Sequence, residues 1–258
     1  MSILLPRRRI LQAAMAGAGS FLLSGCDRIA NNESVNSVLR MAESITMGAQ
    51  RAIISDKSLA PEFSEADLSP VFRSNGTSMP TSDEYAKLQD GKFADWRLVV
   101  GGKVRQPLSL SLDDLKRLPS RTQITRHDCV EGWSAIGKWT GVPLGLILQT
   151  AGVIADARYA LFHCADDLEE SEDGSGVYYE SIDLVDAFHP QTILAYSLNG
   201  DALPVANGAP LRLRVERHLG YKQAKYIMRI ELVDSFAAFG QGRGGYWEDR
   251  GYEWYAGI

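Results

Sequence analysis

Residues 126–148 read RHDCVEGWSAIGKWTGVPLGLIL, a stretch that joins an isolated cysteine to a segment with helical spacing. Cys129 is one of only three cysteines in the chain of 258 residues. On its own, this cysteine could be an inert buried thiol, half of a disulfide with Cys164, a nucleophile activated by Arg126 or His127, or a metal ligand. Spacing alone favours the inert thiol, because free cysteine is among the most buried residue types.

Two histidines beside the cysteines raise the question of a zinc site. Its four ligands would be His127, Cys129, His163 and Cys164. Structural zinc sites usually space paired ligands by about two to four residues, whereas these pairs are adjacent or separated by one residue. Adjacent residues of a strand point to opposite faces and cannot easily reach one ion. The spacing therefore disfavours zinc.

Short helices and hairpins surround the opening stretch. Pro143 suits the first turn of a helix, and Gly152 suits its end. Ser111 predicts the cap of another short helix. Asn199-Gly200 lies between two apolar runs and predicts a hairpin. Residues 211–216 alternate apolar and charged side chains, which predicts a strand with one wet or functional face.

The order of these elements indicates the α+β class. Helices and hairpins interleave without a regular βαβ alternation, and we find neither an internal repeat nor an interior linker. We expect one domain with a mixed sheet over residues 71–258, with a loop-like entry that extends from residue 56 to residue 92. Residues 27–70 are interpreted as a tether and an amphipathic helix that Ser34 caps.

The N-terminus resembles an export signal. Arg7 and Arg8 precede a short apolar segment, as in twin-arginine signals, and LLSGC resembles a lipoprotein box that ends at Cys26. The segment is shorter than the roughly 20 residues that span a bilayer. Residues 1–26 therefore predict a twin-arginine signal with a lipobox and a periplasmic location, with a lipid anchor at Cys26 or a simply cleaved signal as the two outcomes.

Charge and motifs narrow the function further. Without residues 1–25 the chain carries 24 basic and 32 acidic residues, which disfavours nucleic-acid binding. The sequence contains no P-loop, G-x-S-x-G or H-E-x-x-H motif. It also lacks the C-x-x-C-H motif and the cysteine runs of iron–sulfur proteins, so we expect neither haem nor a cluster in this chain.

Several separated segments together resemble the catalytic domain of the sulfite oxidase family, whose members hold molybdenum through molybdopterin. The resemblance covers roughly residues 70–235, and its order along the chain is more specific than any one motif. The matching segments are FRSNGTSMP, DWRLVVGGKV, LSLDDLKRLP, the opening stretch, LAYSLNGDALPVANGAPLRLRVER and GYKQAKYIMRI. The resemblance implies a sulfite-oxidase-type fold and a Mo-molybdopterin cofactor.

The resemblance also implies a set of site residues. Cys129 corresponds to the single protein ligand of the metal, and a soft thiolate suits a centre that already carries dithiolene sulfurs. Cationic side chains suit the phosphate that ends the pterin. Without the resemblance, Arg212 would be read as part of a solvated strand face and residues 220–222 as an ordinary turn. The implied pterin-binding residues are Arg73, Asn75, Cys164, Asn207, Arg212, Gly220, Tyr221, Lys222 and Lys225.

The residues after Cys129 separate this chain from true sulfite oxidases, which place arginines there for the sulfite anion. Here Val130 and Glu131 follow, as in the Cys-Val-Glu-x-Trp-Ser pattern of the periplasmic methionine sulfoxide reductase catalytic subunit. This departure makes sulfite a less suitable substrate. Tyr178 and Tyr179 are catalytic candidates, because their hydroxyls could offer a proton, although core aromatics would look the same.

The resulting interpretation is an exported oxidoreductase that transfers an oxygen atom in a two-electron step. Its substrate would be a small S-oxide, an N-oxide or a sulfur oxyanion. Because the chain lacks haem and cluster motifs, we expect a separate membrane cytochrome or quinone-linked electron partner. Two alternatives remain at this point: a non-catalytic binding module with the same fold, and a thiol-dependent enzyme that uses Cys129.

Overall fold

The computed structural model describes residues 33–171 and 174–258, so the expected signal, with Arg7, Arg8 and Cys26, lies outside the described residues. The chain divides into a small unit that ends at Ala52 and a larger one that begins at Ile53. Helix α2 (Glu33–Ile53) forms the described part of the small unit. Ser34 lies within this helix, so the expectation that Ser34 precedes the helix as its cap was wrong. No helix of the described part is long and apolar enough to cross a membrane.

The larger unit contains two five-stranded sheets rather than one, which confirms the α+β class. The first sheet has the order β2-β1-β10-β5-β6, and only its β1–β10 pair is parallel. Its strands are β1 (Arg97–Gly102), β2 (Leu108–Ser111), β5 (Tyr159–Asp167), β6 (Val177–Asp183) and β10 (Ile227–Val233).

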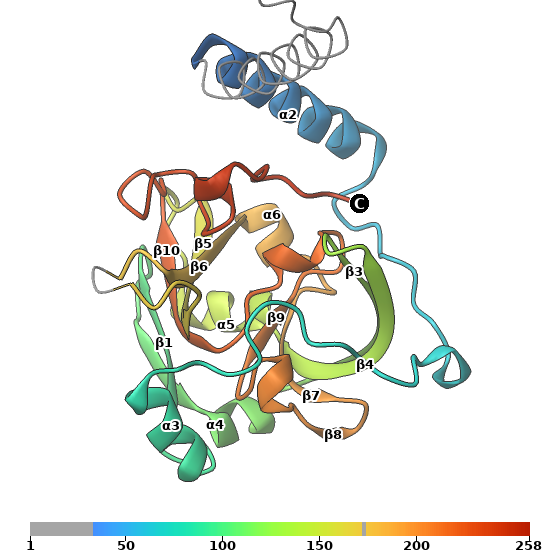
Figure 1. Ribbon diagram of the computed structural model, residues 1–258, viewed down its shortest axis with the longest axis vertical. Coiled ribbons are helices and arrows are strands. Elements are labelled where there is room, and N and C mark those ends of the chain that lie inside the picture. The colour runs from blue at the N-terminus through green and yellow to red at the C-terminus, as the bar shows by residue number, and fades with distance from the viewer. Residues whose placement is uncertain (1–32, 172–173) are drawn as a thin grey trace, which may run out of the picture. The chain divides into compact units, whose positions relative to one another are not determined.

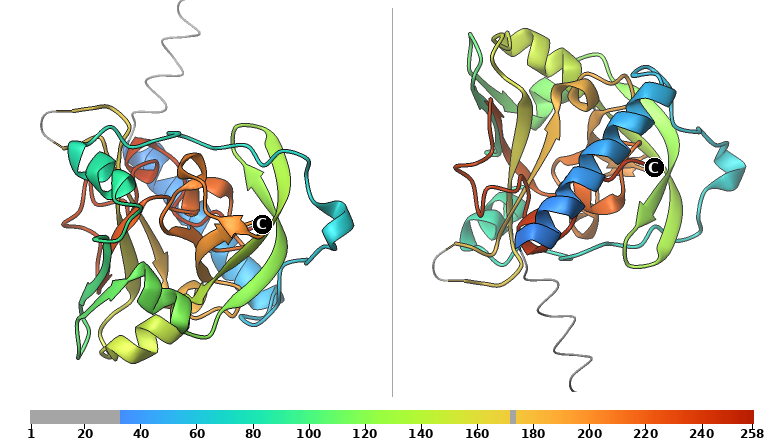
Figure 2. Two further views of the ribbon diagram at one scale, coloured as in Figure 1. Left: turned by 90° about the horizontal axis from the view of Figure 1, so that it is seen from below. Right: turned by 90° about the horizontal axis from the view of Figure 1, so that it is seen from above.

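The second sheet is antiparallel throughout. Its order is β3-β4-β7-β8, and β9 pairs with β7 as well. Figures 1 and 2 show the first sheet and the β3–β4 ribbon on opposite sides of the larger unit. The strands are β3 (Arg121–Cys129), β4 (Trp133–Pro143), β7 (Ile193–Leu198), β8 (Asp201–Ala202) and β9 (Arg212–Arg214).

Local sequence signals account for most of the short elements. Helix α4 (Leu112–Arg117) begins after Ser111, whose hydroxyl accepts from the Asp114 amide. Helix α5 (Leu144–Ala151) follows Pro143 and ends at Gly152, which adopts a φ of 68°. Helix α6 (Leu184–Ala187) and four 3₁₀ turns complete the set. These turns are η1 (Glu65–Asp67), η2 (Val205–Asn207), η3 (Gly220–Lys222) and η4 (Glu248–Arg250).

One expectation about the entry segment was wrong. Residues 83–90 form helix α3 (Asp83–Asp90) instead of a loop, because Ser82 caps its first turn and Tyr85 anchors it in the interior. The expected hairpin at Asn199-Gly200 is confirmed, and both residues adopt the positive φ of a tight turn.

The charged residues of β9 lie in the interior. Arg212 and Arg214 are completely buried, and their guanidinium carbons lie 5.3 and 4.4 Å from the ring centroid of Trp139. The sequence left two possibilities for the charged face of β9, exposure to solvent or a functional role. The burial of both arginines excludes exposure to solvent. Burying two guanidinium groups is costly, so the strand must supply partners for both.

Candidate active site

The hairpin of β3 and β4 carries Cys129 at its tip. The two strands pair from Arg121 with Gly141 to Cys129 with Trp133, and Gly132 allows the turn with a φ of 85°. Alternate residues of β3 point inward, and Cys129 is the last of them, with 8% of its surface exposed. Burial raises the pKa of its thiol, which does not favour a free thiolate nucleophile.

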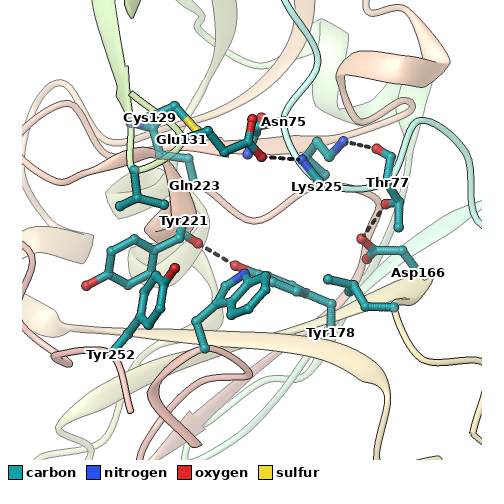
Figure 3. A pocket seen from close by; sticks show the side chains of 14 residues that line it. Asn75, Thr77, Cys129, Glu131, Asp166, Tyr178, Tyr221, Gln223, Lys225 and Tyr252 are labelled. Atoms are coloured by element: carbon teal, nitrogen blue, oxygen red, sulfur yellow. Dashed lines mark hydrogen bonds between the residues drawn. The ribbon is translucent and has the colours of Figure 1, made fainter. Parts of the chain in front are cut away.

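Cys129 opens into a cavity that segments far apart in the sequence surround (Figure 3). The entry loop before α3 forms one part of its wall, and β5, β6, the η3 region and the C-terminal tail form the rest. The residues that line it are Asn75, Gly76, Thr77, Cys129, Val130, Glu131, Asp166, Leu168, Tyr178, Tyr221, Gln223, Lys225, Trp247 and Tyr252.

Arg212 and two asparagines form a polar cradle beside this cavity. The Nη2 of Arg212 donates to Oδ1 of Asn75 at 3.0 Å, and its Nη1 donates to the carbonyl of Asn207 at 3.2 Å. Its Nε and the Nδ2 of Asn207 are buried donors that have no acceptor among the described residues. Such donors are costly to bury, so their presence fits an anionic or polar group bound here.

Lys225 brings a second cation to the cavity. Its ammonium donates to the carbonyls of Thr77 and Ala206, and no carboxylate of the described residues forms an ion pair with it. Burial, followed by the charge of Arg212, lowers the pKa of Lys225 to about 7. A bound phosphate would compensate this unpaired, buried ammonium.

Asp166 lies on the same wall as Lys225. Its Oδ2 accepts from the hydroxyl of Thr77 at 2.8 Å, whereas its Oδ1 has no donor within residues 33–171 and 174–258. Burial raises the pKa of Asp166 to about 6. This carboxyl group can therefore hold a proton close to neutral pH.

The donors around the cavity match a phosphate-bearing pterin that binds a metal through one cysteine. The thiol of Cys129 could serve as a soft sulfur ligand. Among the described residues, Arg212 and Asn207 each keep a donor without an acceptor, and the ammonium of Lys225 has carbonyls as acceptors. Residues 85–238 also match the oxidoreductase molybdopterin binding domain family, which covers more than half of the chain.

The chain belongs to this molybdopterin-binding family.

The chain is also similar to individual known proteins. The chain is 41% identical over 251 residues to a putative protein-methionine-sulfoxide reductase subunit YedZ1 from Azospira oryzae, covering 97% of this chain and 87% of that protein. It is also 41% identical over 152 residues to the protein-methionine-sulfoxide reductase catalytic subunit MsrP of Xanthomonas axonopodis, but spans only 46% of that protein. The sulfane dehydrogenase SoxCD of Paracoccus pantotrophus superposes with a TM-score of 0.49 and 25% identity, over 55% of this chain and 39% of that one.

The structure separates the two lysines that the molybdopterin resemblance assigned to the cofactor. The ammonium of Lys222 donates to Oε1 of Glu180 at 2.5 Å and to Oε1 of Glu248 at 2.6 Å, and all three side chains are buried. These two carboxylates compensate the charge of Lys222. The side chain also does not line the cavity, so the structure does not place it with the cofactor-binding donors.

The other members of the η3 turn also have structural tasks. A Cβ on Gly220 would lie 2.5 Å from Nε2 of His127, so glycine allows this turn to pack on β3. Tyr221 lines the cavity, and its hydroxyl donates to the carbonyl of Glu253. Arg73 is exposed and lies outside the cavity lining, although its neighbour Asn75 reaches the cradle.

The two cysteines of the larger unit are both free thiols. Cys164 packs in the main core rather than on the cavity surface, and burial raises the pKa of its thiol well above the usual range. In the described part of the chain, no three His, Cys, Asp or Glu side chains group as a metal site would require. His127 is completely buried and contacts Arg214 and Gln223.

Tyr178 and Tyr179 point to opposite sides of β6, as neighbours on a strand must. Tyr178 lines the cavity and donates its hydroxyl to the Tyr221 carbonyl, while burial raises its pKa well above the usual range. Tyr179 lies away from the cavity and donates to Asp249 and to the Phe239 carbonyl. Both hydroxyls thus donate to protein acceptors, and only Tyr178 lines the cavity.

Sequence reasoning missed several residues of the cavity. Asp166 and Gln223 carried no motif of their own, although both stand within two residues of positions that the resemblance singled out. Trp247 and Tyr252 come from the C-terminal tail, which forms bridges from Gly245 to Glu180 and from Gly257 to His218.

Proposed function

We propose that this chain is the catalytic subunit of a molybdopterin-dependent oxidoreductase that reduces S-oxides, with oxidised methionine as the substrate class. The observation that carries the proposal is the cavity that begins at Cys129 and is bordered by donors lacking protein acceptors. Two relatives that are 41% identical are named protein-methionine-sulfoxide reductase subunits, which supports the choice of S-oxide over N-oxide and sulfur oxyanion.

The protein's part in the reaction is to hold and orient the cofactor. Cys129 would bind the metal, while Arg212, Asn207, Asn75 and Lys225 would bind the pterin and its phosphate. When bound, the molybdenum cofactor supplies a two-electron redox centre that exchanges an oxygen atom with the substrate. The buried donors are arranged in advance, so little reorganisation accompanies binding.

The reduction needs protons and electrons in balance. The sulfur–oxygen bond breaks, and the oxygen leaves as water after taking up two electrons and two protons. Asp166 is the lining acid that can hold a proton near neutral pH, because burial raises its pKa to about 6. The two electrons come from a separate membrane cytochrome or quinone-linked subunit.

The proposal includes export to the periplasm by the twin-arginine route. Its support is the Arg7-Arg8 pair and the lipobox-like segment that ends at Cys26. Replacement of both arginines by lysine is expected to leave the protein in the cytoplasmic fraction. Labelling with a fatty-acid analogue, compared between the native chain and Cys26→Ala, distinguishes a lipid anchor from simple cleavage.

The central test is elemental analysis together with pterin fluorescence of the natively exported protein. We expect about one molybdenum and one pterin per chain, and reduction of peptide methionine sulfoxide with an artificial electron donor at a higher rate than turnover of N-oxides or sulfite. Metal-free protein from a host that makes the cofactor would instead support a binding module. Activity that survives molybdenum starvation and stops on thiol alkylation would support a Cys129-dependent enzyme.

A further inference from the structure

Apart from Lys225 and the Arg212 cradle, which the proposed cofactor would occupy, the cavity offers little to attract an anionic substrate. Among the residues that line it, the charged side chains are Glu131, Asp166 and Lys225, and no arginine is present. The ammonium of Lys225 is directed at the carbonyls of Thr77 and Ala206. Recognition of a sulfur oxyanion requires cations or several free donors, so this lining is unsuited to it.

Glu131 places a negative charge close to the metal ligand. It follows Cys129 by two residues, and its Oε2 accepts from Nε1 of Trp133 at 2.9 Å. Its Oε1 faces the amide of Gly76 at 3.4 Å. Figure 3 shows Glu131 beside Cys129 and Asn75 on one side of the cavity. These contacts hold the carboxylate at the place where an incoming oxyanion would be repelled.

Three aromatic residues that line the cavity, Tyr221, Trp247 and Tyr252, are here called the aromatic wall. In Figure 3, Tyr221 and Tyr252 lie below Cys129 and Glu131. Trp247 stacks on Tyr252 with ring centroids 5.3 Å apart and an interplanar angle of 27°. Tyr221 meets Tyr252 edge-on at 5.2 Å. The wall is thus a packed surface rather than three separate side chains.

Aromatic rings suit the groups that flank the sulfur of an S-oxide. Thioether sulfurs and their methyl groups make favourable contacts with aromatic rings, and a neutral S-oxide carries no net charge that Glu131 would repel. Discrimination between two ligands can come from an unfavourable contact with one of them as well as from a favourable contact with the other.

We infer that Glu131 and the aromatic wall form the substrate subsite, in which the carboxylate rejects sulfur oxyanions and the wall seats the alkyl groups of a neutral S-oxide. The inference rests on the proposed function, since it names what determines the substrate of the same cavity. Glu131, Trp247 and Tyr252 are specificity-determining residues in this assignment.

The first experiment compares holoenzyme variants for binding of an oxyanion and of a neutral S-oxide. Glu131→Gln keeps an acceptor for Trp133 but removes the charge. We expect the affinity for sulfite, relative to kcat/KM for methyl phenyl sulfoxide, to rise about tenfold in this variant. Glu65→Gln, which removes an equal charge from an exposed pair with Lys138 outside the cavity, should change neither value.

The second experiment addresses the aromatic wall. Trp247→Ala is expected to raise KM for methyl phenyl sulfoxide about tenfold with a smaller change in kcat, and Trp247→Phe should restore most of the affinity. Binding of methyl phenyl sulfide, followed by tryptophan fluorescence, gives a readout that needs no turnover. Molybdenum content and thermal melting of each variant show that cofactor and fold are retained.

The outcomes separate the inference from the proposed function. If the wild type reduces S-oxides but Glu131→Gln and Trp247→Ala leave the ratio of anion to S-oxide affinity unchanged, the subsite assignment is overturned. If no S-oxide is turned over while Glu131→Gln still strengthens sulfite binding and Trp247→Ala still weakens sulfide binding, the subsite stands and the proposed reaction fails.

Discussion

Lys222 and Lys225 stand three residues apart, yet their ammonium groups differ in their partners: carboxylates surround the first, and neutral carbonyls surround the second. Lys222 lies in a buried ion cluster, where Glu180 and Glu248 each accept a hydrogen bond from its ammonium. Although burial alone would lower the pKa of Lys222, these carboxylates raise it. Lys225 lies at the cavity, where carbonyls are its acceptors and its pKa falls to about 7.

The comparison shows how to recognise a binding site among buried charges. The ion cluster is compensated within the protein, so its task is to hold the η3 turn against the C-terminal tail that carries Glu248. The cavity keeps cations and donors that lack carboxylate partners, such as the Nε of Arg212. Incomplete compensation is the feature expected of a site that binds an anionic cofactor.

The largest effect is expected in the cavity, at Cys129. Cys129→Ala removes the proposed soft metal ligand and should lower the proposed S-oxide reduction by at least about a thousandfold, with loss of bound molybdenum. The melting temperature of the cofactor-free protein should stay close to that of the wild type, because only a small side chain is removed. Steady-state kinetics, elemental analysis and calorimetry measure the three quantities; retained molybdenum would contradict the assigned ligand.

A large effect on stability, rather than on chemistry, is expected in the ion cluster. Lys222→Met leaves two buried carboxylates without their cation and should lower the free energy of unfolding by about 3–5 kcal/mol. Chemical denaturation provides the measurement. Activity per bound molybdenum should change little, because the lysine does not line the cavity. A severe loss of cofactor without a loss of stability would place Lys222 at the phosphate instead.

Lys225→Met should give the reverse pattern, with weaker cofactor retention and a distinctive pH dependence. The pKa of Lys225 in the folded protein, about 7, is lower than the unfolded value of 10.5, so the unfolded chain binds more protons between these values. The wild type should therefore gain stability relative to Lys225→Met as the pH rises from about 7 to 10. Denaturation of both cofactor-free proteins across this range tests the sign; a parallel pH dependence would argue against a buried, unpaired lysine.

The smallest effect is expected at Tyr179, on the outer side of β6. Tyr179→Phe removes a hydroxyl that donates to Asp249 and should cost about 1–2 kcal/mol of stability. S-oxide turnover should remain within about twofold of the wild type, because this side chain does not line the cavity. Kinetics at saturating substrate provide the check, and a strong loss of turnover with unchanged melting would return Tyr179 to the catalytic candidates.

Local signals predicted the short elements well. Ser111, Gly152 and the Asn199-Gly200 pair act through contacts within a few residues, so their helix cap, helix end and hairpin could be foreseen. Helix α3 was missed because its apolar pattern is short and its anchor, Tyr85, donates to the carbonyl of Ala209, far along the chain. The sorting of strands into two sheets likewise depends on distant pairings.

The candidate site divides in the same way. The sequence by itself determined that Cys129 is chemically conspicuous, that an acidic residue follows it, and that cations gather in residues 212–225. Only the tertiary structure decided which of those cations face the cavity, because that depends on where Glu180 and Glu248 come to lie. The tertiary structure also decided that Trp247 and Tyr252 line the cavity. Burial and charge compensation depend on which residues are neighbours in space, and the order of residues along the chain does not specify those neighbours.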